Sequence, residues 1–182
     1  MGMDFMDGQE LYALRYMEEK DLQLVLKWRN SDRIRTNMFN DRRIKLKEHR
    51  DWYFNLDKVK NHFLIFEYNN DPAGLVYFKD LDFDNLSCYW GFYIGKEKLP
   101  KGTGTKMGNL GLEFAFKKLN INKLCGQVFA FNHRSIQFHK KLGFIKENEF
   151  KYFRNNKYED VIRYVLYKNQ WKNQSDRSED GA

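Results

Sequence analysis

Short segments that are apolar throughout, or that alternate between apolar and polar residues, predict strands along most of the chain. These segments are Leu11–Met17, His62–Tyr68, Ala73–Leu81, Asn85–Ile94, Lys123–Ala130, Phe144–Phe153 and Tyr158–Tyr167. Turn residues separate two neighbouring pairs, at Asn69–Asp71 and at Asn155 with Asn156. We therefore expect turns that join successive strands at both places.

Apolar residues at helical spacing predict helices between the strands. The expected helices are Glu19–Trp28, a short one that begins at Ser31, Lys47–Asp57, one that follows Gly102, and Ser135–Leu142. Gly143 is typical of the residue that ends a helix. The order of elements predicts an α/β (α+β) domain with a mixed, mostly antiparallel sheet of about seven strands flanked by helices.

The chain has 182 residues, which suits one domain. We expect a flexible leader over residues 1–9, one domain over residues 10–171 and a flexible tail over residues 172–182. The 16 Phe, 11 Tyr and 4 Trp argue for a packed core and an aromatic-lined site, and against disorder.

Lys and Arg number 32 against 25 Asp and Glu, so the formal net charge is +7. This excess suggests an anionic partner: nucleic acid, a phosphorylated cofactor or a nucleotide sugar, unless it is only a solvated surface. Basic and acidic residues are interleaved without a recognisable nucleic-acid module, which argues against nucleic acid. No apolar run has the length of a membrane span or a signal peptide, so we expect a cytoplasmic protein that does not enter a membrane.

The cysteines and histidines show no spacing typical of metal ligands, so no metal site is expected. The residues are Cys88, Cys125, His49, His62, His133 and His139. The two cysteines lie in apolar, strand-like segments and are expected to be buried thiols in a reducing compartment; the sequence leaves a disulfide open.

A glycine-rich segment, Pro100–Thr105, lies between an expected strand and an expected helix. Glycines at this place let backbone N–H groups point at an anion, and the helix N-terminus adds partial positive charge. The segment has neither the P-loop pattern nor the dinucleotide-binding pattern. It predicts either a pyrophosphate cradle or a tight turn from strand to helix.

A second segment, Asn132–Phe144, follows a strand and ends in glycine and phenylalanine. With the glycine loop, it resembles the GNAT superfamily of acyl-CoA-dependent N-acetyltransferases, including its N-x-x-[SA]-x-x-[FL]-[YH]-x-K-x-G-F pattern. One position departs from the family. Leu99 stands where the superfamily prefers Gln or Arg, so one side-chain anchor for the cofactor is missing.

The N-terminal half resembles one branch of this family, which acetylates an amino sugar in pseudaminic acid biosynthesis. The residues that carry this resemblance are Trp28, Arg29, Asn30, Arg35, Met38, Ile44, His49, Trp52 and the segment from Ser87 to Gly95. The resemblance implies acetyl transfer to the 4-amino group of UDP-4-amino-4,6-dideoxy-N-acetyl-β-L-altrosamine, a nucleotide-linked amino sugar.

The resemblance also implies where acetyl-CoA lies. Two parallel strands, Tyr89–Gly95 and Leu124–Ala130, are expected to splay apart around it, with a backbone N–H near Phe92–Ile94 polarising the acetyl carbonyl. The implied cofactor residues are Phe92, Tyr93, Ile94, Lys101, Gly102, Thr103, Gly104, Thr105, Asn132, Ser135, Phe138 and Lys141.

For the chemistry, the resemblance implies direct attack of the amine on the thioester in a ternary complex. His139 stands at the position of the family's general acid. Asp80 and Tyr77 are candidates for a base, unless the amine loses its proton to solvent. The implied substrate residues are Arg29, Met38, Phe39, His49, Trp52, Tyr77 and Trp90, with Arg29, Arg35 or Lys45 on the UDP phosphates.

Three alternatives stay open at this point. The chain could acetylate ribosomal or other protein N-termini, which needs an open groove for a peptide. It could also bind acyl-CoA without catalysis. A free edge strand at the C-terminal end of the sheet makes a homodimer possible.

Overall fold

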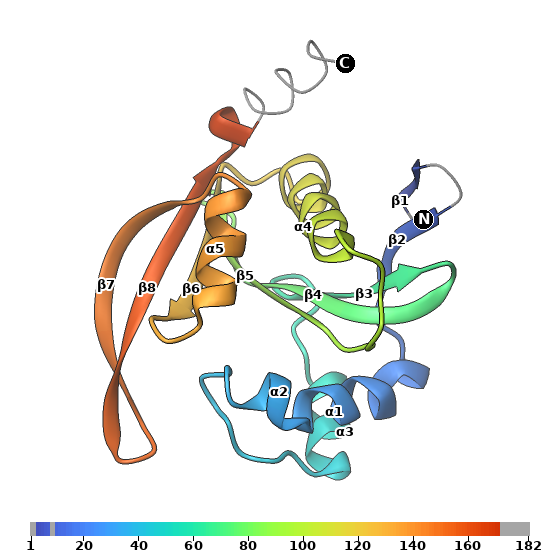
Figure 1. The fold of residues 1–182 in the computed structure, drawn as a ribbon, viewed down its shortest axis with the longest axis horizontal. Helices are drawn as coiled ribbons and strands as arrows, with labels where there is room; N and C mark the ends of the chain where they lie inside the picture. Colours follow the sequence, from blue (N-terminus) through green and yellow to red (C-terminus); the bar gives the residue numbers. More distant parts are fainter. Residues whose placement is uncertain (1–2, 8–9, 172–182) are drawn as a thin grey trace.

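The structure, a computed structural model, describes residues 3–7 and 10–171. Its eight strands form one sheet in the order β1-β2-β3-β4-β5-β6-β8-β7 (Figure 1). The strands are β1 (Met3–Asp7), β2 (Glu10–Tyr16), β3 (His62–Tyr68), β4 (Asp71–Asp82), β5 (Ser87–Ile94), β6 (Lys123–Phe129), β7 (Ile145–Arg154) and β8 (Lys157–Tyr167).

Helices cover both faces of this sheet. The helices are α1 (Leu22–Asn30), α2 (Asp32–Arg35), α3 (Leu46–Phe54), α4 (Thr103–Glu113) and α5 (His133–Lys141). One turn of 3-10 helix, Glu19–Asp21, leads into α1, and a π-helical segment, Phe114–Lys118, continues α4. In Figure 1, α1–α3 lie on one side of the sheet and α4 and α5 lie on the other.

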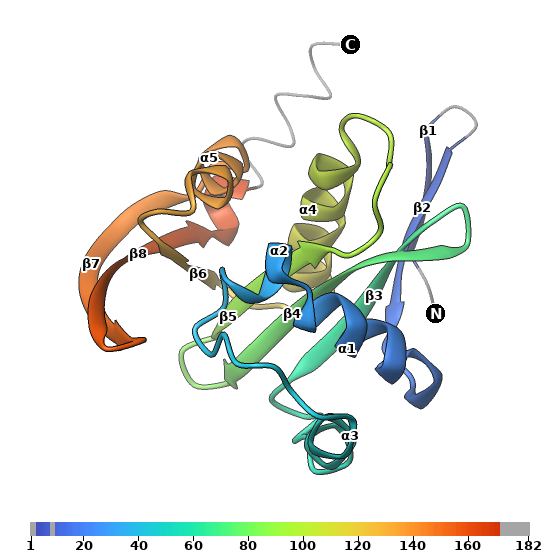
Figure 2. The same ribbon diagram turned by 60° about the horizontal axis from the view of Figure 1, so that its bottom comes forward.

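The sheet is antiparallel except between β5 and β6. These two strands pair with each other only from Ser87–Lys123 to Trp90–Gly126, and beyond this point each continues paired only with its other neighbour, β4 or β8. Figure 2 shows β6, β8 and β7 curving away from the other strands. The predicted V between two splayed strands is therefore confirmed, and it lies in the middle of the sheet.

Each face of the sheet has its own hydrophobic core. The core under α4 and α5 contains Phe78, Trp90, Met107 and Phe144. The core under α1–α3 contains Trp28, Tyr53, Ile65 and Tyr93. Successive strand residues alternate between the faces, so β5 contributes Trp90 to one core and Tyr93 to the other. The strands with the site residues are thus fixed from both sides.

The predicted elements are all present, with ends that shift by a few residues. Three details differ from the sequence predictions. Residues Met3–Asp7, expected in a loose leader, form β1 against β2, so the sheet has eight strands rather than seven. The π-helical segment was not foreseen. The helix expected to begin at Ser135 begins at His133, with Asn132 as its N-cap and the Asn132 side chain accepting from the Ser135 amide at 3.1 Å.

The expected tail at residues 172–182 lies outside the described residues. Among the residues that the structure describes, no helix is both long enough and apolar enough to span a membrane. β7 is the outermost strand of the sheet order, and its side chains are mostly exposed. Pairing of two copies along this edge stays a prediction.

Gly95 directly follows β5 and leaves the space that the Trp28 ring fills. A Cβ on Gly95 would lie 2.0 Å from the nearest indole atom, which is far inside van der Waals contact. Trp28 is buried in the core under α1–α3. This glycine therefore fixes how closely α1 approaches the end of β5.

We predict that Gly95→Ala destabilises the protein by about 2 kcal/mol, because the indole or the strand must move. Chemical denaturation followed by fluorescence measures the change. Gly104→Ala is the control: its Cβ would meet atoms no closer than 3.7 Å, and alanine favours the helix. Equal stability of Gly95→Ala and the natural chain would contradict the proposed contact.

Candidate functional site

A cavity of about 930 Å³ lies where β5 and β6 part. It has two sides, because the strand residues around it alternate between the faces of the sheet. On the side of α4 and α5 its wall includes Phe92, Met107, Ser135 and Phe138. On the side of α1–α3, its wall includes residues of β4 and of the segment that follows α2. We call these the cofactor side and the acceptor side.

The glycine loop forms one end of the cofactor side. Gly102 is the N-cap of α4 with a φ of 94°, a conformation that glycine adopts without strain, and a Cβ there would point into open space. The first turn of α4 carries the partial positive charge of the helix, while the amides of Thr103 and Thr105 donate to the carbonyl oxygens of Pro100 and Gly102 at 3.3 and 2.8 Å. Gly102, Thr103 and Gly104 all line the cavity. This arrangement fits a pyrophosphate group.

The parted strands supply a second set of backbone groups. Beyond Trp90, one edge of β5 has no strand partner, and Phe92, Tyr93 and Ile94 line the cavity there. The Arg33 side chain of α2 donates to the carbonyl oxygens of Ile94 and Gly95, both at 3.0 Å. These bonds hold the end of β5, so the free edge is presented in a fixed position to a ligand.

His139 of α5 lines the cofactor side, with only 3% of its surface exposed. Trp90 Nε1 donates to His139 Nε2 at 3.2 Å, so this ring nitrogen is an acceptor. His139 Nδ1 lies 2.8 Å from the carbonyl oxygen of Ser135, so it carries the proton. Burial lowers the pKa of His139 to about 4.

This geometry does not suit the acid role that the family resemblance implies for His139. The neutral ring has one N–H, which already donates to a helix carbonyl, and its other nitrogen accepts from an indole. A general acid needs a proton that it can give near neutral pH. In this structure the histidine instead joins α5 to β5, and Gly126 makes room for it, because a Cβ there would lie 2.4 Å from His139 Nε2.

Aromatic side chains dominate the acceptor side. Tyr77 stacks on Phe63 with ring centres 5.4 Å apart, and Gly91 makes room for the Tyr77 phenol. Burial raises the pKa of both Tyr77 and Tyr93. The two phenols therefore keep their protons near neutral pH, which removes Tyr77 as a base and leaves it as a hydrogen-bonding group.

The residues 36–41 form the outer wall of the acceptor side. Asn37, Met38 and Phe39 line the cavity, although the segment is neither helix nor strand. Arg29 donates to the Asn40 carbonyl, and Arg35 donates to the Asp41 carbonyl at 2.5 Å. The position of this wall thus depends on arginines that bind its backbone.

The structure brings together most of the residues predicted from the sequence. Among the predicted cofactor residues, all but Thr105 and Lys141 line the cavity, and those two hydrogen-bond to each other at 3.0 Å beside the loop. Leu99, the departure from the family pattern, also lines the cavity and packs against the core.

The predicted substrate residues divide into three groups. Met38, Phe39 and Tyr77 line the acceptor side. Trp90 lines the cavity from the cofactor side, where it stacks on Phe144. Three others stand behind the wall, packed in the layer of α1 and α3: Arg29, His49 and Trp52.

Arg29 and His49 have buried nitrogens without a hydrogen-bond partner, Nη1 and Nε2 respectively. Burial lowers the pKa of both side chains. Neither Arg35 nor Lys45, the other candidates for phosphate contacts, lines the cavity; Asp80 does.

Several cavity residues were missed by the sequence reasoning. They are Arg33, Asn37, Lys79, Tyr89, Gln127, Phe129 and Arg134. Period-two alternation from Tyr77 and Gly91 would have pointed to Lys79 and Tyr89 on the same face. Helical spacing relates Arg33 to Asn37. Gln127 and Phe129 had no signal of their own, because they line the cavity only where β6 leaves β5.

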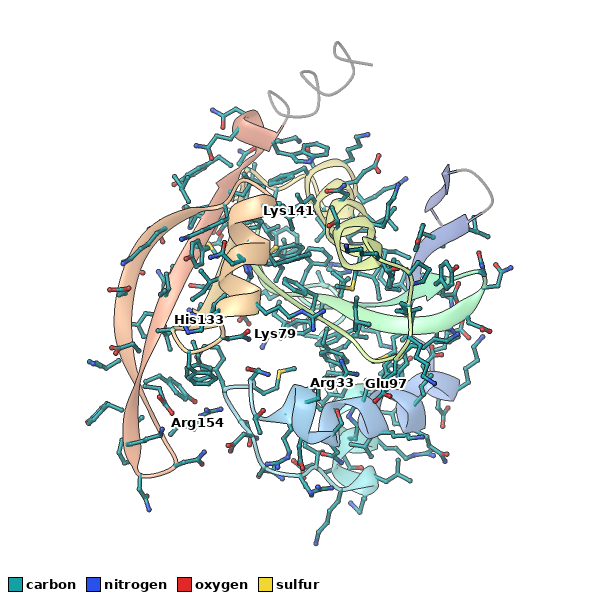
Figure 3. The ribbon with its side chains drawn as sticks, in the orientation of Figure 1. Arg33, Lys79, Glu97, His133, Lys141 and Arg154 are labelled. Atoms are coloured by element: carbon teal, nitrogen blue, oxygen red, sulfur yellow. The ribbon has the colours of Figure 1, made fainter. Side chains whose placement is uncertain are left out.

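The charges of the cavity wall are mostly positive. The basic residues that line it are Arg33, Lys79, Lys96, Lys98, Lys101 and Arg134, and the acidic ones are Asp80 and Glu97. Figure 3 shows Lys79 near the middle of the view, with Arg33 and Glu97 next to each other below it. Within the described part of the chain, no cluster of three His, Cys, Asp or Glu side chains could hold a metal ion.

Cys88 and Cys125 are both buried and free. Burial raises the pKa of the Cys88 thiol to about 12, so it stays protonated near neutral pH. The two residues lie one register position apart on β5 and β6, so their side chains leave opposite faces of the sheet. The disulfide that the sequence left open does not form.

Residues 12–145 match a family model described as an acetyltransferase (GNAT) domain. Among curated proteins, the chain is 23% identical over 168 residues to spermidine N(1)-acetyltransferase from Vibrio cholerae, covering 90% of this chain and 97% of that protein. It is 30% identical over 142 residues to acetyltransferase PseH from Campylobacter jejuni, covering 75% of this chain and 85% of that protein.

A solved structure with a similar fold is that of spermidine N-acetyltransferase from Vibrio cholerae in complex with CoA and spermine. The TM-score is 0.82 at 21% identity, over 88% of this chain and 98% of that chain. At this identity the likeness concerns the fold.

We predict that His139 stays neutral in the folded protein at all pH values above about 4. The unfolded chain binds a proton at this residue near the ordinary value of 6.5, so the free energy of unfolding falls as the pH drops from 6.5 to 4. The loss reaches about 3 kcal/mol at the lower end. NMR of the imidazole nitrogens measures the tautomer and its titration.

The variant His139→Gln provides the comparison for this prediction, because it removes the titrating group. Its stability should lose the part of the pH dependence that belongs to residue 139, between pH 6.5 and 4. A His139 ring that takes up a proton near neutral pH would restore the acid role and overturn the assignment.

Proposed function

The chain belongs to the GNAT family of acetyltransferases, and from that premise we propose that its acceptor is a nucleotide-linked amino sugar. The coarser activity follows from the family: an acetyl group moves from acetyl-CoA to an amine. The proposal adds that the amine is the 4-amino group of a UDP-4-amino-4,6-dideoxy-N-acetylhexosamine, as in pseudaminic acid biosynthesis.

The charge of the cavity wall is the observation that carries the proposal. A polyamine such as spermidine carries several positive charges and needs carboxylates around it. The whole cavity wall offers two carboxylates, Asp80 and Glu97, and the cations Arg33 and Lys79 lie on the acceptor side. Cations beside an aromatic wall suit a sugar linked to phosphates, since lysine and arginine attract phosphate groups. The basic residues of the cofactor side have a separate explanation in the phosphates of acetyl-CoA.

The relatives support two acceptors unequally. The spermidine acetyltransferases align over more of the chain, and PseH aligns at higher identity over less of it. The segments from Trp28 to Asn30 and from Trp90 to Gly95 resemble the amino-sugar branch. Arg29 of the first donates to the Asn40 carbonyl of the acceptor wall, and Tyr93 of the second belongs to the core under α1–α3. Polyamine acetylation is the second candidate. The longer alignment with the spermidine acetyltransferases favours it, and the positive charge of the cavity wall opposes it.

Different residues of this chain serve the acetyl carbonyl and the attacking amine. The edge of β5 from Phe92 to Ile94 is placed to donate an N–H to the acetyl carbonyl, which gains negative charge during attack. The attacking amine must first lose a proton. Asp80 lines the cavity and can accept that proton directly or through water; otherwise the amine loses it to solvent. With His139 engaged on both nitrogens, the leaving thiolate takes its proton from water.

The acceptor can be identified in a thiol-release assay with acetyl-CoA and three amines in parallel. These are the UDP-4-amino-6-deoxy sugar, spermidine and a short peptide with a free N-terminus. We expect kcat/KM for the sugar to exceed that for spermidine by at least about tenfold, since one repulsive contact costs about 1–2 kcal/mol. Mass spectrometry identifies the product.

The other outcomes of this assay have separate meanings. Acetylation of spermidine or of the peptide alone would overturn the sugar assignment and leave the family activity intact. Tight binding of acetyl-CoA without turnover of any of the three amines would favour a binding protein.

A charge reversal tests the cation on the acceptor side. We predict that Lys79→Glu lowers kcat/KM for the sugar nucleotide by about tenfold, because a carboxylate repels its phosphates. Lys151→Glu is the matched control, since Lys151 pairs with Asp160 at 2.6 Å on the β7–β8 hairpin and does not line the cavity. Unchanged kinetics of Lys79→Glu would place the phosphates elsewhere.

A further inference from the structure

The segment of residues 36–41 is the least regular part of the cavity wall. It consists of turns and bends, yet it contributes Asn37, Met38 and Phe39 to the acceptor side. A wall without helical or strand hydrogen bonds keeps its shape only if its backbone groups bind something else. Arg29 and Arg35 bind the carbonyls at the end of the segment, those of Asn40 and Asp41. The carbonyls at its beginning need a different donor.

Arg154 supplies that contact from the opposite end of the sequence. It is the last residue of β7, and its Nη1 donates to the carbonyl oxygen of Met38 at 2.7 Å and to that of Thr36 at 3.0 Å. In Figure 3, the Arg154 side chain lies between the β7–β8 hairpin and the segment that follows α2. The side chain is only 9% exposed.

The surroundings of Arg154 direct its hydrogen bonds to these carbonyls. Its guanidinium lies 4.4 Å from the centre of the Phe129 ring, and Phe129 itself lines the cavity. The carboxylates of Asp41 and Glu159 both lie 3.9 Å from the guanidinium, beyond hydrogen-bond distance. Glu159 is bound more closely by Lys157, at 2.9 Å.

Two neighbouring contacts join the same pair of segments. The Phe39 ring packs against Tyr152 of the hairpin with centres 4.9 Å apart. The same ring also packs against Phe129 of β6, with centres 4.7 Å apart. The Asn155 side chain donates to Asp41 at 2.6 Å. The tip of the β7–β8 hairpin thus binds the acceptor wall along its length, and Arg154 binds it at two backbone atoms.

We propose that Arg154 is a positioning residue for the acceptor: it fixes the wall of residues 36–41 and so sets the affinity for the amine substrate. The inference rests on the proposed function only in its choice of substrate. Arg154 makes no hydrogen bond to the glycine loop or to α5, and its ring contacts are with Phe129 and Phe131 at the end of β6. We therefore expect its loss to affect acceptor binding more than acetyl-CoA binding.

The test compares Arg154→Ala, Arg154→Lys and the control Lys151→Ala in steady-state kinetics with both substrates. We expect Arg154→Ala to raise the KM of the acceptor about tenfold, with kcat and the KM of acetyl-CoA changed less than about twofold. Arg154→Lys keeps the charge but lacks the planar fork that aims hydrogen bonds, so we expect an intermediate KM. Lys151→Ala should match the natural protein.

Hydrogen exchange of the amides in residues 36–41 gives a second readout that needs no acceptor. We expect faster exchange there in Arg154→Ala and unchanged exchange in α4 and α5. An unchanged acceptor KM with unchanged exchange would overturn the proposal. So would an equal rise of both KM values together with a lower melting temperature, which would mark a general structural role.

The identity of the acceptor does not decide this test. If spermidine rather than the sugar proves to be the substrate, the same KM comparison is made with spermidine. Failure of the proposed function then shows in which amine is turned over, and failure of the present inference shows in the variants.

Discussion

The parting of β5 and β6 after Trp90 and Gly126 is the constraint on which the rest of the site depends. A parallel pair that continued would use the backbone edge of β5 for strand hydrogen bonds and would close the passage between the two faces of the sheet. The Trp90–His139 hydrogen bond sits at the point of separation, in space that only a glycine at position 126 leaves open. A buried, neutral histidine with both nitrogens bonded holds α5 against β5 there and costs no buried charge. Structural anchoring explains the low pKa of His139 better than catalysis does.

Because the cavity passes through the sheet, its two sides are built from different parts of the chain. The cofactor side comes from consecutive elements, from β5 through α4 and β6 to α5, and uses backbone amides and a helix N-terminus. The acceptor side joins the segment after α2 to β4 and the β7–β8 hairpin. Backbone groups bind any phosphorylated carrier of an acyl group, whereas the choice of amine falls to side chains and to the position of one irregular segment. Lys79 and Arg154 belong to the acceptor side, Lys79 as a residue of the cavity wall and Arg154 as a support behind it.

The cofactor side could be predicted from the sequence because its signals are local. The Pro100–Thr105 loop, the helix after it and the Asn132–Phe144 segment each contain their own turn residues, caps and spacing. The acceptor side had weaker signals, because its contacts join distant residues: Arg154 and Met38 are 116 positions apart. His139 shows the limit most clearly. Its place in the motif was visible, but its protonation depends on Trp90 and on burial, which no spacing along the chain reveals.

The same division limits what family membership says about the substrate. The matched residues, 12–145, include the glycine loop, both parted strands and α5, and they stop where β7 begins. The contacts that hold the acceptor wall from the other side, Arg154 and Asn155, lie beyond that stretch. Two chains can therefore share the cofactor side and differ in the amine they accept, since a hairpin of different charge or length would place the wall differently. Proteins that acetylate different amines can share one fold for this reason, and the residues of the acceptor wall decide between the amines.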